Sequence, residues 1–298
     1  MKYELAVFGH IVLDHVSRNG PVRGPQLGGP CTYAGLAANA LDAKTIAASK
    51  VGSDLGNKRL SWLLSHGIST SHIQVTGSET TRFEINYRNE NRTIRVISLC
   101  ASLDDKGLSR LPPSSAIHIC PVLNEIPLSL ANQLTKGDSM VGLDPQGYLR
   151  QLGSEGKVRL RRFTAHQLLK RIGVLKTSEG EFPATSGGNW WIKRLKSLGP
   201  DIVLLTRGRL GVIVWSRENG LFNIPAYPTI VRDPTGAGDA LAGAFLVTWT
   251  RTWDMLWSAA VGVAVASFVV ARTGHGDFGT RKQIERRALK VLEETTRI

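Results

Sequence analysis

Cysteine is scarce in this chain of 298 residues, which has only Cys31, Cys100 and Cys120. The three are odd in number, widely spaced and without a Cys-x-x-Cys pair. The sequence therefore indicates neither a disulfide framework nor a zinc site. This cysteine usage is typical of reduced thiols, so we expect a cytoplasmic protein.

Long hydrophobic runs are also missing. The longest, Ala259 to Ala271, is shorter than the about 20 residues that a membrane-spanning helix needs. The N-terminus has an early acid, Glu4, and no long apolar segment, so we expect no signal peptide. With 42% apolar and 20% charged residues, the composition is ordinary for a globular protein, and we expect no membrane partner.

Acidic residues are few beside the basic ones: 24 Asp and Glu stand against 37 Lys and Arg, a formal net charge of +13. Such a charge attracts anionic partners, including nucleotides and nucleic acid, or it is simply a solvated basic surface. The basic residues are spread along the chain, and their densest groups are Lys157–Arg162 and Arg281–Lys290. This spread favours the solvated surface, so we expect no nucleic-acid partner.

Strand-like and helix-like segments alternate along the chain. Helical patterns cover 30–41 and 56–66, and short apolar runs predict strands at 4–9, 43–51, 116–119, 139–143, 174–176, 202–206 and 212–216. Alternating units of this kind predict a mostly parallel sheet covered on both faces. Residues 81–99 instead alternate apolar and polar side chains about a turn at 89–91, which predicts an inserted β-hairpin. Trp249, Trp253 and Trp257 have the spacing of one helix face.

The most informative stretch is Asp233-Pro-Thr-Gly-Ala-Gly-Asp239, which leads directly into a small-residue apolar segment. A loop that turns into a helix N-terminus reads this way. Such a terminus offers unpaired backbone N–H groups and a positive dipole end, so it can hold an anion. Asp239 would repel an anion that is merely bound there. The carboxylate makes sense if it takes a proton from a hydroxyl that attacks a phosphate.

This stretch resembles the C-terminal signature of the ribokinase-like, or PfkB, family of carbohydrate and nucleoside kinases. The resemblance implies one domain over 1–298, an α/β fold built as a Rossmann-like α/β/α sandwich with a small β-sheet lid from about 10–27 and 72–101. It also implies ATP and Mg²⁺, and in some members a monovalent cation such as K⁺. Lid strands pair between subunits in this family, so a homodimer through the lid is expected.

The resemblance assigns the reaction centre. Asp239 is expected to be the general base, and the amides of Gly236, Ala237 and Gly238 are expected to form the anion hole for the transferred phosphoryl group. Asp233 matches a family position that in some members helps to bind a monovalent cation. Asp239 is alternatively a first-turn acid that only stabilises its helix.

The resemblance also assigns a donor side. Thr206-x-Gly208-x-x-Gly211 looks like the family's nucleotide-binding turn, and Arg207 within it is a candidate phosphate contact; a plain β-turn is the alternative. Relatives often carry Asn-x-x-Glu, whose Glu holds a magnesium-bound water, whereas this chain has Ser178-x-x-Glu181. That pair also reads as a capping box that opens a helix. Two further candidates for contacts with ATP are Lys176, at a strand end, and Gly274, in the segment expected to pack the base.

Candidates on the acceptor side lie mainly in the first half of the chain. Asp14 matches the family's acid for substrate hydroxyls, since a carboxylate accepts from two hydroxyls at once. Gly28 and Gly29 match the family's Gly-Gly, where missing side chains let substrate approach the backbone. Tyr33 is a further candidate. The segment in which it lies differs from the ribokinase sequence, and this difference argues against ribose as the specific acceptor. Further candidates follow strands or lie in the lid: Arg82, Asn124, Gln146 and Arg150.

The sequence therefore predicts a kinase that phosphorylates a hydroxyl of a sugar or cyclic polyol, inositols included. A nucleoside kinase of the same family is the close alternative, because the sequence does not reveal whether a stacking pocket for a base exists. A non-catalytic basic protein that binds nucleic acid on a kinase fold is a remote alternative. The intact 233–239 signature argues against it, since a pure binder has no use for Asp239.

Overall fold

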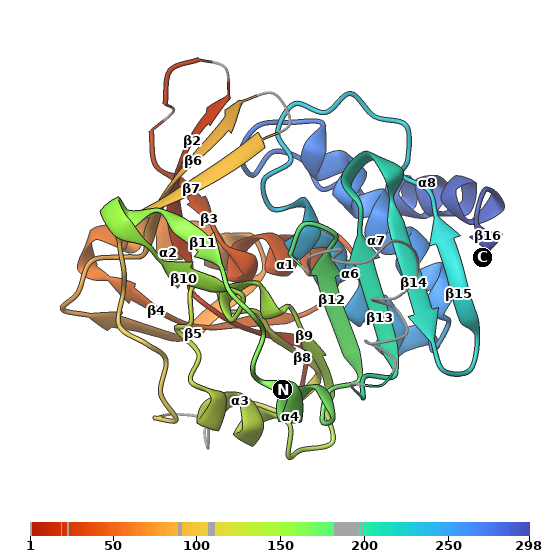
Figure 1. Cartoon of the computed structure of the whole chain (residues 1–298), viewed down its shortest axis with the longest axis horizontal. Helices are drawn as coiled ribbons and strands as arrows, with labels where there is room; N and C mark the ends of the chain where they lie inside the picture. Colours follow the sequence, from red (N-terminus) through yellow and green to blue (C-terminus); the bar gives the residue numbers. More distant parts are fainter. Residues whose placement is uncertain are drawn as a thin grey trace.

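The centre of the fold is a long mixed sheet (Figure 1). The computed structural model describes residues 2–18, 20–22, 24–88, 91–106, 111–181, 197 and 199–298. Within them, ten strands lie in the order β16-β15-β14-β13-β12-β9-β8-β1-β4-β5. Their bounds are β1 Tyr3–Phe8, β4 Thr45–Gly52, β5 Ile68–Thr76, β8 Ser114–Ile119, β9 Met140–Leu143, β12 Val174–Ser178, β13 Ile202–Thr206, β14 Val212–Ser216, β15 Gly220–Ile224 and β16 Thr296–Arg297.

Neighbouring strands are parallel from β5 through to β13, and β14, β15 and β16 continue the sheet as antiparallel strands. The prediction of a mostly parallel sheet is confirmed. The antiparallel pairing of β14 with β13 and of β15 with β14 follows from the short turns after β13 and β14, which leave no length for a crossover helix.

Helices cover both faces of this sheet. Leu5 and Val7 of β1 belong to one apolar cluster and Ala6 and Phe8 to another, so alternate residues of a strand serve opposite cores. The first cluster takes in residues of α1 Pro30–Asn39, α2 Asn57–Ser65, α6 Ala237–Thr252, α7 Met255–Val270 and α8 Arg281–Glu293. The second takes in α3 Leu128–Leu134 and α4 His166–Leu169. The expected α/β/α sandwich is confirmed.

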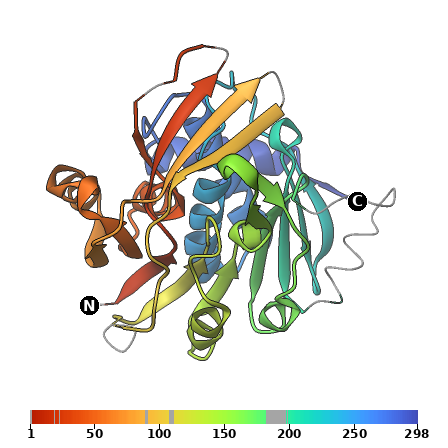
Figure 2. The same ribbon diagram turned by 60° about the vertical axis from the view of Figure 1, so that its left-hand side comes forward.

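A second, small sheet stands over one edge of the main one (Figure 2). Its order is β3-β2-β6-β7, with bounds β2 Val12–Arg18, β3 Gln26–Gly28, β6 Arg82–Arg88 and β7 Asn91–Ser98. The predicted hairpin is confirmed in β6 and β7, while residues 89 and 90 of its turn lie outside the described residues. Residues 72–76 of the expected lid belong instead to β5 of the main sheet.

The helical spacing of the tryptophans is misleading. α6 ends at Thr252, Trp253 has φ 54°, and α7 begins at Met255, so Trp249 and Trp257 lie on different helices. The prediction of one helix face is therefore wrong. Trp249 and Trp253 still pack edge to face, with ring centroids 5.2 Å apart, because the left-handed residue folds the chain back. Among the described residues, no helix has the length and apolarity to cross a bilayer.

Candidate active site

A cavity of about 980 Å³ opens where the parallel strands of the main sheet end. The carboxyl ends of parallel strands meet at one edge of a sheet, and ligands bind beyond that edge. The N-terminus of α6 and the inner face of the small sheet form its other walls. Among the residues that line it are Asp14, Gly29, Tyr33, Gln146, Arg150, Lys176, Ser178, Glu181, Thr206, Arg207, Gly208, Gly211, Gly236, Ala237, Gly238 and Asp239.

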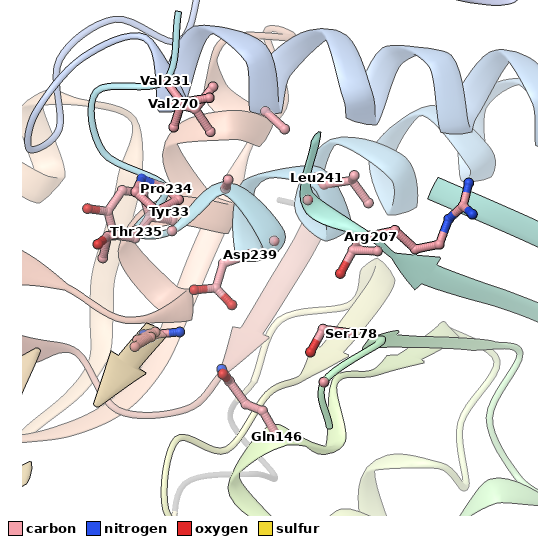
Figure 3. Close-up of a pocket in the computed structure, with 18 of the residues that line it drawn as sticks. Tyr33, Gln146, Ser178, Arg207, Val231, Pro234, Thr235, Asp239, Leu241 and Val270 are labelled. Atoms are coloured by element: carbon pink, nitrogen blue, oxygen red, sulfur yellow. The ribbon is translucent and has the colours of Figure 1, made fainter. Parts of the chain in front are cut away.

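The loop before α6 is built to leave its end open. Gly236 has φ 78°, and a Cβ there would lie 2.3 Å from ring atoms of Tyr33, so only glycine fits. The side chain of Asp233 accepts a hydrogen bond from the Thr235 N–H at 2.9 Å and stabilises the turn. Asp239 follows in the first turn of α6, and its carboxylate points into the cavity, toward the side where Gln146 lies (Figure 3).

Backbone amides at this terminus face the cavity with few competing partners. The Ala237 N–H donates to the Pro234 carbonyl at 3.3 Å. In the part of the chain that the structure describes, the N–H groups of Gly236 and Gly238 have no hydrogen-bond partner. A 16-residue helix adds its positive dipole end here. The terminus can therefore hold an anion, as the sequence predicts.

The surroundings of Asp239 raise the pKa of its carboxyl, which favours proton exchange near neutral pH. Burial raises the pKa of its carboxyl to about 6, and the neighbouring Asp144 also raises it, while Lys176 and Arg150 oppose the shift. The Lys176 Nζ is held 2.6 Å from Asp144 Oδ2 in a buried ion pair. A carboxylate with a pKa near neutrality is a better proton acceptor than an ordinary aspartate.

Asp14 lies across the cavity on β2, with 4% of its surface exposed. Its Oδ1 is buried and has no hydrogen-bond partner among the described residues. Burial raises the pKa of Asp14 to about 7, and Asp239 raises it further, whereas Arg92 opposes the shift. A buried carboxylate oxygen without a partner needs a donor, and a ligand hydroxyl can supply it. Gly28 makes room for this carboxylate, because a Cβ there would lie 2.2 Å from Asp14 Oδ2.

The segment after β9 brings two polar side chains to the cavity wall. Asp144 caps a tight turn at Pro145–Gly147 by accepting from the Gln146 N–H at 3.1 Å. Arg150 is buried, donating to the Val122 carbonyl at 3.1 Å and to Gln146 Oε1 at 2.8 Å. The arginine is thus held in place, although the sequence alone equally allows a solvent-facing side chain.

The turns after β12 and β13 lie side by side at the opposite wall. The Glu179 N–H donates to the Thr206 carbonyl at 3.0 Å, which ties the two turns together. Glu181 Oε2 accepts from the Ser178 N–H at 3.0 Å, the contact expected of a capping box. The Arg207 N–H closes its turn on the Gly211 carbonyl at 2.8 Å.

The oxygen ligands around Glu181 suit a Mg²⁺ ion that takes its other ligands from substrate and water, and not a metal ion coordinated by protein side chains alone. No group of three or more His, Cys, Asp or Glu within the described ranges could hold a metal by itself. Mg²⁺ typically uses one or two carboxylates together with substrate phosphates and water. Glu181 at the cavity wall, with Oε2 committed to backbone, is such a partial site.

Several predicted site residues lie outside the cavity lining. Arg82 points away from it and forms an ion pair with Asp54, because the inward positions of β6 are Phe83 and Ile85. Asn124 donates to the Arg150 carbonyl at 2.9 Å and so supports a neighbour instead of lining the site. The others that do not line it are Gly28, Asp233 and Gly274.

Sequence reasoning did not single out Arg92, and it gave Gly274 instead of residues of α7 as a wall of the cavity. Arg92 and Tyr87 reach it from the small sheet, and the Tyr87 hydroxyl lies 3.0 Å from Thr235 Oγ1 in the loop before α6. Ala266 and Val270 supply an apolar wall from α7, where Gly274 was expected. Strand alternation could have found Arg92, since it shares its face with inward-pointing Ile94. Apart from Ser258 and Ser267, α7 has no polar side chain, so its hydrophobic pattern does not mark the face that lines the cavity.

The chain is similar to known kinases over most of its length. A family model described as pfkB family carbohydrate kinase matches residues 26–281. A cytidine kinase of Thermococcus kodakarensis is 25% identical over 91% of this chain and 97% of the relative. An inositol 3-kinase of Arabidopsis thaliana is 24% identical over 91% of this chain and 75% of the relative. A pyrophosphate-dependent kinase of the ribokinase family, solved with a pyrophosphate analog and myo-inositol, superposes with a TM-score of 0.81 at 23% identity, covering 95% of this chain and 99% of the other.

Proposed function

We propose a specific reaction for this chain, which belongs to the pfkB family of carbohydrate kinases and is therefore a phosphotransferase with an alcohol group as acceptor. In this reaction the γ-phosphoryl group of ATP is transferred to a hydroxyl of a sugar or cyclic polyol, inositols included. One observation carries the proposal. Asp239 shares a cavity with Asp14, and among the described residues the amides of Gly236 and Gly238 and the buried Oδ1 of Asp14 have no hydrogen-bond partner.

In this reaction Asp14 accepts hydrogen bonds from acceptor hydroxyls and orients one of them toward Asp239. The oxygen of that hydroxyl attacks the γ-phosphorus of ATP while Asp239 takes the hydroxyl proton. ADP leaves on the opposite side of the phosphorus, in line with the attacking oxygen. The Gly236 and Gly238 amides stabilise the charge on the transferred phosphoryl group. Lys176, within reach of Gly238, adds positive charge on the donor side.

The phosphate donor, ATP, fits the walls of the cavity that the acceptor does not use. The turn 206–211 and Arg207 suit phosphates, and the apolar wall from Ala266 to Val270 suits a purine ring. ATP and Mg²⁺ are typical of this family, and Glu181 with Ser178 would hold the Mg²⁺, which supplies neutralising charge on the donor phosphates. Pyrophosphate is the donor to compare with ATP, since a structural neighbour depends on it.

A nucleoside is the second candidate acceptor. Phe83 and Tyr87 present aromatic rings to the cavity from the small sheet, and such rings can stack on a base. The similarity to a cytidine kinase along nearly the whole chain supports this candidate too.

An acceptor screen tests the proposal. We expect ADP release with Mg²⁺ and at least one sugar, inositol or nucleoside, and none without acceptor. ATP and pyrophosphate should be run in parallel, each with and without K⁺. Failure of every acceptor with both donors would exclude the proposed reaction, and turnover of nucleosides alone would select the second candidate.

The acid limb of the pH profile should report the two aspartates. Both carboxyls must be ionised to act, so kcat/KM should fall as pH drops below about 7, where Asp14 gains a proton, and more steeply below about 6, where Asp239 does. Because Asp239 raises the pKa of Asp14, the two titrations are coupled and the profile belongs to the pair. Steady-state rates at saturating donor measure it, with the donor dissociation constant at each pH as the control. A profile that stays flat to about pH 5 would contradict both roles.

A further inference from the structure

Three side chains form a row across the small sheet, on the face that lines the cavity. Arg18 on β2 pairs with Tyr87 on β6, which pairs with Arg92 on β7, and all three line the cavity. Tyr87 is engaged with Thr235, and Arg18 donates to the Val231 carbonyl at 3.3 Å. Arg92 lies 5.8 Å from the Tyr87 ring centroid and has no hydrogen bond or ion pair within the described ranges. Its charge is therefore available to the cavity.

A second cation, Arg150, lines the same cavity and is buried. Arg150 has 8% of its surface exposed, and its hydrogen bonds go to the neutral oxygens of Val122 and Gln146. No described carboxylate forms an ion pair with it. Buried charges in proteins are normally paired, because removing them from water is costly. Burial lowers the pKa of Arg150 and the charge of Arg92 lowers it further, whereas the carboxylates of Glu181, Asp144 and Asp239 oppose the shift.

The acids nearby do not balance this pair. Asp144 is committed to Lys176 at 2.6 Å. Asp14 has a pKa of about 7 despite Arg92, so at neutral pH its carboxyl is only partly ionised. Asp239 must accept a proton during the reaction proposed above. Among the described residues, no carboxylate therefore lies at ion-pair distance from Arg92 or Arg150, and the anionic group of a ligand would supply that partner.

We propose that the acceptor carries an anionic group, a phosphate or a carboxylate, and that Arg92 and Arg150 bind this group while Asp14 holds a hydroxyl. The inference rests on the proposed kinase function and narrows its acceptor class. Guanidinium groups suit both anions, since their planar N–H donors match two oxygens at once. Arg92 would be a specificity-determining residue contributed by the small sheet.

The charges place this anion on the acceptor side of the cavity. Among charged groups, Arg92 acts most strongly on Asp14, whereas Lys176 acts most strongly on Asp239. The transferred phosphoryl group already has the α6 amides and Lys176 beside it. Arg92 also lines the cavity from the same small sheet as Asp14, since β6 pairs with both β2 and β7, so we assign it to the acceptor side.

Matched acceptor pairs test the inference: ribose with ribose 5-phosphate, fructose with fructose 6-phosphate, and myo-inositol with myo-inositol 1-phosphate. We expect kcat/KM at least about tenfold higher for an anionic member than for its neutral partner, as charged hydrogen bonds imply. Arg92→Gln should reduce that ratio by about 10- to 100-fold, through KM more than kcat. Arg95→Gln is the control, because Arg95 lies on the opposite face of β7, where it donates to the Glu155 carbonyl at 3.0 Å.

The outcomes separate this inference from the kinase proposal. Equal use of neutral and anionic acceptors overturns the anion site and leaves the kinase activity standing. A fall in kcat of equal size for both members in Arg92→Gln also overturns it, because the charge would then act on the transferred phosphoryl group. Calorimetric binding of ribose 5-phosphate, weakened in Arg92→Gln but not in Arg95→Gln, supports the site without relying on turnover. No ADP with any acceptor removes both proposals.

Discussion

Asp239→Asn is expected to lower kcat by about 10²- to 10⁴-fold, the range associated with loss of a general base. Asparagine has nearly the same shape but accepts no proton at neutral pH, so the cavity and the α6 terminus should remain as they are. The first-turn acid also interacts with the helix dipole, but that contribution is only about 0.3–1 kcal/mol. We therefore expect a large change in turnover and a small one in thermal stability.

The measurements are single-turnover ADP formation with the acceptor found in the screen, donor affinity by calorimetry, and the melting temperature. Asp254→Asn is the matched control. Asp254 caps α7 by accepting from the Trp257 N–H at 2.9 Å and does not line the cavity. It is expected to keep full turnover. A variant at position 239 that retains more than about a tenth of kcat would show that another group takes the proton.

Lys176→Met is expected to destabilise the protein by about 3–5 kcal/mol, because it leaves Asp144 buried without its partner. The Lys176 side chain is 8% exposed and the Asp144 side chain 0%, with 2.6 Å between Nζ and Oδ2. Burial alone would lower the pKa of Lys176, but the carboxylates of Asp144 and Glu181 outweigh it and raise the pKa above its ordinary value. Turnover should fall as well, since the ammonium lies beside Gly238.

Urea unfolding measures the change in free energy. Asp144→Asn in the Lys176→Met background should recover most of it, because the amide oxygen can still cap the Gln146 N–H while the uncompensated charge is gone. Lys157→Met breaks an exposed pair with Glu155 and should leave stability unchanged within error. If the double variant were no more stable than Lys176→Met, the loss would come from packing instead of charge.

Much of the main sheet was predictable, since each strand and helix carries its own pattern. Residues 30–41, 43–51 and 202–206 were recognised from local hydrophobicity and lie close to α1, β4 and β13. The α6 terminus was recognisable for the same reason. A glycine that must adopt φ 78° and an acid in the first turn are neighbours in the sequence, so their relation is local.

Some residues that the sequence assigned to the site lie outside the cavity lining, and these errors share a different cause. Arg82 was assigned to the acceptor although its own strand alternates, and the inward side belongs to Phe83 and Ile85. Asn124 follows a strand toward the site, but its amide is used by the backbone of Arg150. Which neighbour takes up a polar side chain depends on segments far away in the chain, and no local pattern records this.

By itself, then, the sequence determined the family, the α/β architecture and the acid at the head of α6, because these depend on residues adjacent in the chain. Only the tertiary structure decided which charges meet across the cavity. It paired Lys176 with Asp144, left Asp14 Oδ1 without a partner among the described residues, and placed Arg92 and Arg150 in the lining of one cavity. The physical reason is that strand register and the position of the small sheet set these distances, and Coulomb interactions depend on distance and burial instead of order in the sequence.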